Sequence, residues 1–285
     1  MKNIMKQHLF NYGKQEINEE DILKILLSFE TDKCDVLYIH TGLQFGMPNL
    51  KLKRKEILES LANILYKLNV PTLIMPSYTF SFCNEEIFNI SETKSSMGTL
   101  NEYLRTEHHW KRSHDPLMSN ILYGKEQHFI NDIGKNSVGD GSTFDLLAKS
   151  NLKVKFLFLG PRVHDCFTYM HYLEAVEQVQ YRYNFDFEGT IKDGNKVYND
   201  KYSLFIRDDG VQAGGGAKIY ENILIERQLA KFSWLGGGAI TVLDLESAQK
   251  TYIELLRESP NFYIEEVFNT PLRPKTFKKR KMVAL

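Results

Sequence analysis

Apolar residues recur within the first 80 positions of the chain both at helical spacing and in short unbroken runs. Residues 19–29 begin with three acids and continue with apolar positions at helical spacing, and residues 52–68 repeat apolar side chains every three or four positions. Unbroken apolar runs at 36–40 and 71–75 each predict a buried strand. The order helix, strand, helix, strand indicates an α/β unit with parallel strands.

The periodicity weakens after Ser77. Residues 80–118 contain few periodic apolar positions and many polar ones, which is typical of a long functional loop region. Beyond it we expect strands at 117–123 and 154–159, with a short helix between them that ends at Leu147. Catalytic groups often follow the carboxyl ends of strands in such sheets.

Aromatic residues alternate with polar ones after residue 180, at Tyr181, Tyr183, Phe185 and Phe187. This alternation predicts antiparallel hairpins over 181–206, followed by a helix at 217–230. A glycine turn then enters a strand within 235–242, and a last helix begins at Asp244. We therefore predict an α+β fold with a mixed central sheet and flanking helices. Parallel strands occupy its N-terminal half and antiparallel hairpins its C-terminal half, in one domain spanning 1–285.

Composition supports a large packed core, because 42% of the 285 residues are hydrophobic and 12% are aromatic. Lys plus Arg equals Asp plus Glu at 36 each, so no strongly basic field is available to hold nucleic acid. The basic run from Arg273 to Lys281 predicts a solvated tail.

The three cysteines, Cys34, Cys83 and Cys166, are far apart and form no C-x-x-C pair. This pattern argues against a disulfide framework and a structural zinc site, and it predicts reduced thiols. Cys166 lies two residues before Thr168, so a nucleophilic role for it is an open alternative. No apolar stretch reaches the length of a membrane span, and we expect a cytoplasmic protein without membrane insertion.

A T-x-x-H-x-x-E pattern at Thr168, His171 and Glu174 is the strongest chemical signal. Positions three apart share one face of a helix, which predicts a single polar stripe. A neutral imidazole beside a carboxylate accepts protons, and a nearby hydroxyl can donate a hydrogen bond to a developing oxyanion. The set suits acyl transfer to an amine or hydroxyl. The spacing alone also fits a helical metal site or an incidental surface pair.

Four segments, in this order and spacing, carry a resemblance to a known family: PTLIMPSYT at 71–79, SSMGTL at 95–100, RSHDP at 112–116 followed by Ser119, and the T-x-x-H-x-x-E stripe. Together they resemble the aminoglycoside 3-N-acetyltransferase family over roughly residues 36–183. Members of that family, which is distinct from the GNAT fold, move an acyl group from coenzyme A to an amine of an amino sugar. The resemblance implies acetyl-coenzyme A, or another acyl-coenzyme A, as co-substrate and no metal.

The resemblance also implies catalytic roles. His171, with an ordinary pKa near ~6.5, takes the proton of the substrate ammonium. Glu174 orients His171 or holds the ammonium, and Thr168 lies near the thioester carbonyl oxygen. The simplest mechanism is direct transfer in a ternary complex, with no acyl-enzyme.

Implied donor-binding residues gather around the small polar turn at 95–98: Thr41, Ser95, Ser96, Met97, Gly98, Arg112 and Ser119. The backbone N–H groups of this turn can approach pantetheine or phosphates. Ser96 also fits the N-cap of a helix through Leu104, and Arg112 fits either a phosphate contact or a buried loop anchor.

Two positions depart from the family pattern. Asp115 stands where many relatives have histidine, and we expect it to contact substrate, together with Tyr78 and Glu174. Gly42 replaces a serine after His40 and Thr41, and we expect His40 to satisfy a backbone group.

The neutral charge balance argues against a polycationic acceptor. The Phe80-Ser81-Phe82 stretch and the RSxDP variant resemble members associated with surface-polysaccharide assembly. We therefore predict an amino-sugar acceptor, for which a nucleotide-linked sugar is one open form. In that form Lys111, Arg112 and Arg182 could face its diphosphate. The main alternative is an aminoglycoside acetyltransferase that confers antibiotic resistance.

Two less favoured alternatives come from other classes. His108, His109 and His114 suggest a metal-dependent hydrolase, and the aromatic residues of 181–187 suggest a non-enzymatic sugar-binding protein. The predicted partner is a small molecule, and a homodimer is one open form of assembly.

Overall fold

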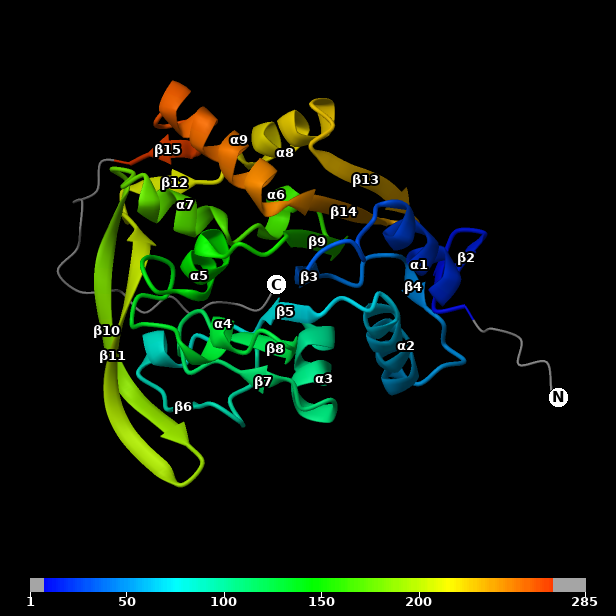
Figure 1. Ribbon diagram of the computed structural model, residues 1–285, viewed down its shortest axis with the longest axis horizontal. Helices are drawn as coiled ribbons and strands as arrows, with labels where there is room; N and C mark the ends of the chain where they lie inside the picture. The colour runs from blue at the N-terminus through cyan, green and yellow to red at the C-terminus, as the bar shows by residue number, and fades with distance from the viewer. Residues whose placement is uncertain (1–7, 269–285) are drawn as a thin grey trace.

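Seven strands form the central sheet, in the order β13-β14-β9-β3-β5-β8-β7 (Figure 1). The computed structural model describes residues 8–268. The parallel middle of the sheet consists of three strands, β3 (Val36–Thr41), β5 (Thr72–Pro76) and β9 (Val154–Gly160). Its antiparallel flanks are β7 (Lys111–Arg112), β8 (Asn120–Gly124), β13 (Ala230–Leu235) and β14 (Gly238–Asp244). The predicted mixed sheet with parallel N-terminal strands is confirmed.

Alternate residues of β3 enter two different cores. Val36 and Tyr38 pack with one hydrophobic cluster, and Leu37 and Ile39 pack with the other. The first cluster includes residues of α5 (Thr143–Lys149), α7 (Met170–Val176), α8 (Ala217–Glu226) and α9 (Leu245–Glu258). The second includes residues of α1 (Glu19–Ser28), α2 (Arg54–Lys67) and α3 (Thr99–Glu107). Because helices cover both faces of the sheet, β3 is apolar on both faces from Val36 to Ile39.

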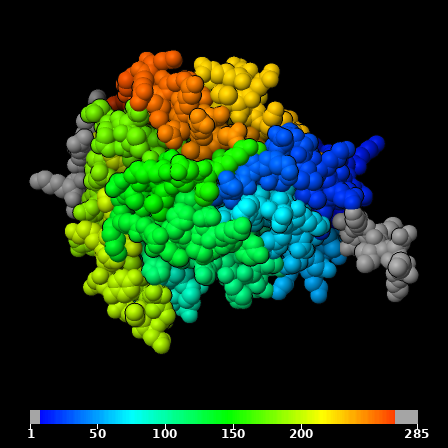
Figure 2. Space-filling view, viewed as in Figure 1, coloured from blue at the N-terminus to red at the C-terminus, as the bar shows by residue number. Residues whose placement is uncertain are grey.

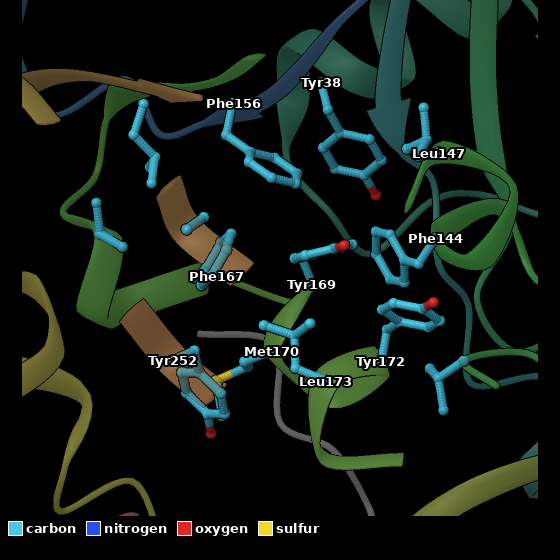
Figure 3. Close-up of a cluster of buried hydrophobic side chains, with 14 of the residues drawn as sticks. Tyr38, Phe144, Leu147, Phe156, Phe167, Tyr169, Met170, Tyr172, Leu173 and Tyr252 are labelled. Carbon is cyan, nitrogen blue, oxygen red and sulfur yellow. The ribbon is translucent and has the colours of Figure 1, made fainter. Parts of the chain in front are cut away.

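Aromatic packing in the first cluster holds α7 against the sheet (Figure 3). Tyr169 lies against Phe156 of β9, with ring centroids 5.0 Å apart, and against Tyr172 at 5.4 Å. Tyr38 of β3 lies 5.8 Å from Phe156 and 5.5 Å from Phe144 of α5. The residues that flank His171 are therefore core residues, which fixes the polar stripe against a rigid base.

A long hairpin of β10 (Arg182–Asp193) and β11 (Lys196–Arg207) runs along one side of the molecule (Figures 1 and 2). It pairs with β6 (Phe88–Asn89) and packs on a third cluster that contains Phe82, Leu117 and Phe187. The predicted hairpin is confirmed, and it forms a wall over the irregular segment 80–118. The smaller elements are β1 (Phe10–Tyr12), β2 (Gln15–Ile17), β4 (Met47–Pro48), β12 (Val211–Ala213), β15 (Ile264–Val267), α4 (His128–Asn131), α6 (Val163–Cys166) and the 3-10 turn η1 (Phe82–Asn84).

Three predicted boundaries were wrong. The helix expected at 217–230 ends at Glu226, because Ala230 begins β13, which pairs with β14 across the glycine turn. The strand expected from residue 117 begins at Asn120, because Leu117 packs under the hairpin. Thr168 lies in the turn before α7, because the short α6 follows β9 first.

Some expectations lie beyond what the fold tests. The basic run Arg273–Lys281 falls outside the described residues, and the single domain stays a prediction. Between residues 8 and 268, none of the helices combines the length and apolar character needed to cross a bilayer.

Gly160 ends β9 at the point where the chain turns toward the polar stripe. Its φ is +107°, and a Cβ there would lie 1.4 Å from the carbonyl oxygen of Gly42. The backbones at the ends of β3 and β9 therefore approach each other at a distance that only glycine permits.

We predict that Gly160→Ala lowers the free energy of unfolding by about 3 kcal/mol, because strained φ and backbone overlap act together. The matched control is Gly194→Ala in the hairpin turn, where φ is +56° but no atom lies within 4 Å of the added Cβ. That variant should lose only about 1 kcal/mol. Urea unfolding measures both, and equal losses would show that the approach to Gly42 carries no cost.

Candidate active site

The carboxyl ends of β3 and β5 meet the start of α3. Thr41 donates a hydrogen bond from Oγ1 to Oδ1 of Asn101 at 2.6 Å, and Asn101 Nδ2 donates to the carbonyl oxygen of Pro76 at 2.7 Å. A Cβ on Gly98 would lie 3.8 Å from the carbonyl oxygen of Thr41. The fold thus brings Thr41 to the predicted donor-binding turn, although 53 or more residues separate them in the sequence.

The turn at 95–98 is held by its own short contacts. Ser95 is buried, its N–H donates to Glu102 Oε2 at 3.0 Å, and its hydroxyl accepts from the N–H of Met97 at 3.1 Å. The N-cap of α3 is Gly98 with a φ of 106°, so the predicted capping role of Ser96 is wrong. Ser96 is exposed, and its N–H donates to the carbonyl oxygen of Tyr78 at 2.9 Å.

A groove of ≈ 840 Å³ opens between α2 and α3 beside this turn. Ser95, Ser96 and Gly98 line it, and so do three cations, Arg54, Lys55 and Lys94. Arg54 Nη2 donates to Thr99 Oγ1 at 2.8 Å, and Lys55 forms an ion pair with Glu107 at 2.5 Å. Sequence reasoning missed Arg54 and Lys55, because only the packing of α2 on α3 brings them to the turn, whereas Lys94 directly precedes it in the sequence.

His171 is held by a buried carboxylate. Its Nδ1 lies 3.0 Å from Oε2 of Glu174, which is fully buried, while 32% of the His171 side chain is exposed. Tyr181 donates its hydroxyl to Glu174 Oε1 at 2.6 Å, and Arg182 Nε forms an ion pair with Oε2 at 2.7 Å. With Nδ1 engaged, Nε2 is the nitrogen that can take a proton.

Burial and the nearby guanidinium of Arg182 keep His171 neutral. Burial lowers the pKa of His171, the positive charge of Arg182 lowers it further, and Glu174 opposes both. Burial alone would raise the pKa of Glu174, but Arg182, His171 and Tyr181 hold that pKa below its usual range. The pair is therefore a neutral imidazole beside a carboxylate, which is the state that a general base requires.

His171 and Arg182 line a second pocket, of ≈ 440 Å³, on the hairpin side. Its lining is mostly apolar: Phe80, Cys83, Met118, Val138, Phe187, Leu204, Phe205, Ile206, Ala213 and Tyr263. Asn84, Arg207 and Asp209 add polar groups. The hairpin therefore supplies much of the wall that faces the imidazole, which no sequence spacing indicated.

Thr168 contacts His40 and Tyr78 rather than His171. Its Oγ1 lies 3.2 Å from His40 Nε2 and 3.0 Å from the hydroxyl of Tyr78. The expectation that His40 satisfies a backbone group was wrong, because its ring reaches the Thr168 hydroxyl at the strand end. Burial lowers the pKa of His40 to about 3, so this imidazole is neutral.

The sequence profile of the aminoglycoside 3-N-acetyltransferase family matches residues 48–246, more than half of the chain. The chain belongs to the aminoglycoside 3-N-acetyltransferase family. This membership confirms the resemblance and the predicted class of enzyme, an N-acetyltransferase. No curated protein sequence matches the chain.

Solved structures of similar proteins share the fold. AAC-IIIb in a binary complex with CoASH has a TM-score of 0.70 at 15% identity, with 84% of this chain and 96% of that chain covered. AAC-VIa bound to sisomicin gives 0.69 at 17%, with 84% and 97% covered. The YokD protein from Bacillus subtilis gives 0.69 at 16%, with 85% and 94% covered. At these identities the likeness establishes the fold.

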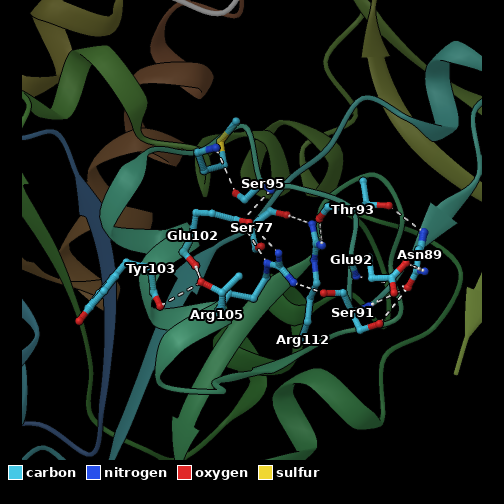
Figure 4. A network of polar contacts seen from close by, with 12 residues as sticks. Ser77, Asn89, Ser91, Glu92, Thr93, Ser95, Glu102, Tyr103, Arg105 and Arg112 are labelled. Carbon is cyan, nitrogen blue, oxygen red and sulfur yellow. Dashed lines mark hydrogen bonds and ion pairs between the residues drawn. The ribbon is translucent and has the colours of Figure 1, made fainter. Parts of the chain in front are cut away.

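Arg112, a family-motif residue, is a buried anchor of the segment 77–93 (Figure 4). Its guanidinium donates to Ser119 Oγ at 3.1 Å, to the carbonyl oxygen of Thr93 at 2.5 Å and to that of Ser77. Burial lowers its pKa to about 9. These contacts favour the loop-anchoring interpretation over a phosphate contact, and Ser119 is part of the same anchor.

Asp115, at the family's histidine position, is also turned into the protein. Its Oδ1 accepts from the N–H groups of Leu117 at 2.8 Å and Met118 at 3.0 Å, and from Ser137 Oγ at 2.9 Å. Burial raises its pKa. Asp115 is not among the residues that line the pocket of His171 and Arg182.

The alternative chemistries gain no support from the geometry. His108 lies between Glu59 at 3.0 Å and Tyr66 at 3.1 Å, and His114 is 53% exposed. No cluster of three or more potential metal ligands occurs within residues 8–268. Burial raises the pKa of Cys166, which keeps its thiol protonated and a poor nucleophile.

We predict that Arg112→Gln lowers the free energy of unfolding by about 3 kcal/mol, because it leaves several buried carbonyl oxygens without a donor. The matched control is Lys111→Gln, the exposed neighbour in β7, which should change it by less than about 0.5 kcal/mol. Urea unfolding measures both. A stable Arg112→Gln protein that has lost affinity for acetyl-coenzyme A would instead favour the phosphate contact.

Proposed function

We propose that this acetyltransferase moves the acetyl group of acetyl-coenzyme A to the amine of an amino sugar, with His171 as general base. The observation that carries the proposal is the placement of His171. Its Nδ1 is hydrogen-bonded to Glu174, and its ring lines the pocket on the hairpin side, which we assign to the acceptor and call the acceptor-side pocket. A neutral base in the wall of a pocket can take the proton of an incoming ammonium group.

The groove between α2 and α3 suits the acyl donor. Arg54 and Lys94 supply positive charge, and the N-terminus of α3 beside Gly98 supplies backbone N–H groups, which together suit the phosphates of coenzyme A. Acetyl-coenzyme A is the acyl donor and supplies an activated thioester. The AAC-IIIb structure in complex with CoASH supports this assignment.

The transfer then needs one base and one acid. His171 Nε2 takes a proton from the ammonium, and the freed amine nitrogen forms a bond to the thioester carbonyl carbon. The carbon–sulfur bond breaks, and the proton held by His171 neutralises the leaving thiolate. The nitrogen releases its remaining extra proton to solvent, so that a neutral amide forms. Glu174 stabilises the imidazolium formed between the two steps, and no covalent acyl-enzyme is needed.

The acceptor-side pocket favours an amino sugar with few positive charges. Glu174, the buried carboxylate beside His171, is already paired with Arg182, and Arg207 and Asp209 contribute opposite charges to the lining. A polycationic aminoglycoside would gain little attraction there, and the apolar lining suits a sugar with few hydroxyl groups. A nucleotide-linked amino sugar of surface-polysaccharide synthesis carries a single amine and therefore needs no surplus of acid in the pocket.

We predict that purified protein with acetyl-coenzyme A acetylates nucleotide-linked amino sugars with at least about tenfold higher kcat/KM than kanamycin or sisomicin. Thiol release measures every acceptor in one assay, and mass spectrometry locates the acetyl group. The corresponding sugars that carry no amine serve as controls. Efficient acetylation of aminoglycosides alone would support antibiotic resistance, the second candidate, which the AAC-VIa complex with sisomicin favours.

We predict that His171→Gln lowers kcat by on the order of 10²–10⁴-fold while acetyl-coenzyme A binding is nearly unchanged. Because burial and Arg182 lower the pKa of His171, the wild-type rate should hold as the pH falls below ~6.5 and decline only at more acidic pH. The matched control is the partly exposed His128, whose His128→Gln variant should keep full activity. Full activity in His171→Gln would remove this residue from the mechanism.

A further inference from the structure

Five side chains form one continuous chain of hydrogen bonds at the strand ends. It runs from His40 to Thr168 at 3.2 Å, to Tyr78 at 3.0 Å, to Tyr38 at 2.9 Å and to Asn120 Oδ1 at 2.6 Å. The residues come from β3, the turn before α7, the segment after β5, and β8. In such a chain, the direction of donation in one hydrogen bond fixes the direction of donation in the next.

Asn120 sets that direction, because an amide oxygen can only accept. Its Nδ2 donates to the carbonyl oxygen of Met118 at 3.1 Å, which turns Oδ1 toward Tyr38. Each hydroxyl has one proton. Tyr38 gives its proton to Asn120, so Tyr78 must donate to Tyr38, and Thr168 must donate to Tyr78.

His40 must therefore donate to Thr168 from Nε2–H. The surroundings of the ring agree with this tautomer: it is 3% exposed and stacks on Phe158 at 4.8 Å with an interplanar angle of 3°. Its buried Nδ1 has no hydrogen-bonding partner among the described residues. A bare acceptor nitrogen is tolerated there better than a buried N–H without an acceptor.

We propose that His40 is a positioning residue for Thr168. As the Nε2–H tautomer, His40 directs the Thr168 proton toward Tyr78, and one lone pair of Thr168 Oγ1 is left to accept an N–H of the bound substrate. This role is the reverse of the one expected from the family resemblance, in which the Thr168 hydroxyl donates to the thioester oxygen. The inference rests on the proposed function in one respect, the identity of the N–H group that Thr168 accepts. That group is either the amine of the acceptor or an amide of pantetheine.

The tautomer is tested directly by 15N NMR of the protein labelled at histidine. His40 is assigned by the signal that disappears in His40→Gln. We expect Nδ1 to show the shift of an unprotonated nitrogen, and Nε2 that of a protonated one, at neutral pH. The opposite tautomer or an imidazolium would overturn the proposal, and this readout does not depend on any acetyl transfer.

A double-mutant cycle tests whether His40 acts through Thr168. His40→Phe keeps the stacked ring but removes the donor, and should lower kcat by on the order of tenfold with little change in the KM for acetyl-coenzyme A. His40→Gln, which restores an N–H near the Nε2 position, should recover most of that loss. In a Thr168→Val background, His40→Phe should cost nothing further.

Equal losses from His40→Phe in both backgrounds would overturn the proposal, and so would unchanged kcat in the wild-type background. Thermal unfolding of each variant separates these outcomes from simple loss of fold. If no amino sugar is a substrate, the proposed function fails, while the same cycle can be read with whichever amine the enzyme acetylates. The two failures are therefore distinguishable.

Discussion

The pairing of the Glu174 carboxylate in the interior is the constraint on which the site depends. A buried charge is costly unless charged or hydrogen-bonding partners surround it. Here His171 comes from the same helix, whereas Tyr181 and Arg182 come from the start of the hairpin. The same contacts that make Glu174 tolerable therefore join α7 to β10, and they place the imidazole against the pocket that the hairpin covers.

The candidate site residues border two hollows of different character. The groove between α2 and α3 is polar and rimmed by cations. The pocket beside His171 is mostly apolar and its charges are balanced. Two consecutive residues at the end of β3 bond in different directions: Thr41 bonds to Asn101 of α3, and His40 bonds to Thr168 before α7.

Membership in an aminoglycoside acetyltransferase family leaves the acceptor to be decided by the site. Family and fold establish how the acyl group is moved, whereas the charge and shape of the pocket select the amine. In this chain Arg182 forms an ion pair with Glu174, the carboxylate next to His171. Asp115 is used within a turn, where it accepts from three protein groups. Asp209 is the acid that lines the pocket beside His171, together with the cations Arg182 and Arg207.

The sequence by itself determined the buried strands, most helices, the hairpin and the His171–Glu174 pair, because these follow from local periodicity and from residues three apart. It also determined the family, through motifs that keep their order along the chain. Tertiary structure alone decided the roles of Arg54, Arg182 and His40, since each meets its partner only after distant elements pack. It likewise turned Asp115 and Arg112 inward, because burial and the supply of nearby carbonyl and N–H groups, rather than residue type, determine what a charged side chain contacts.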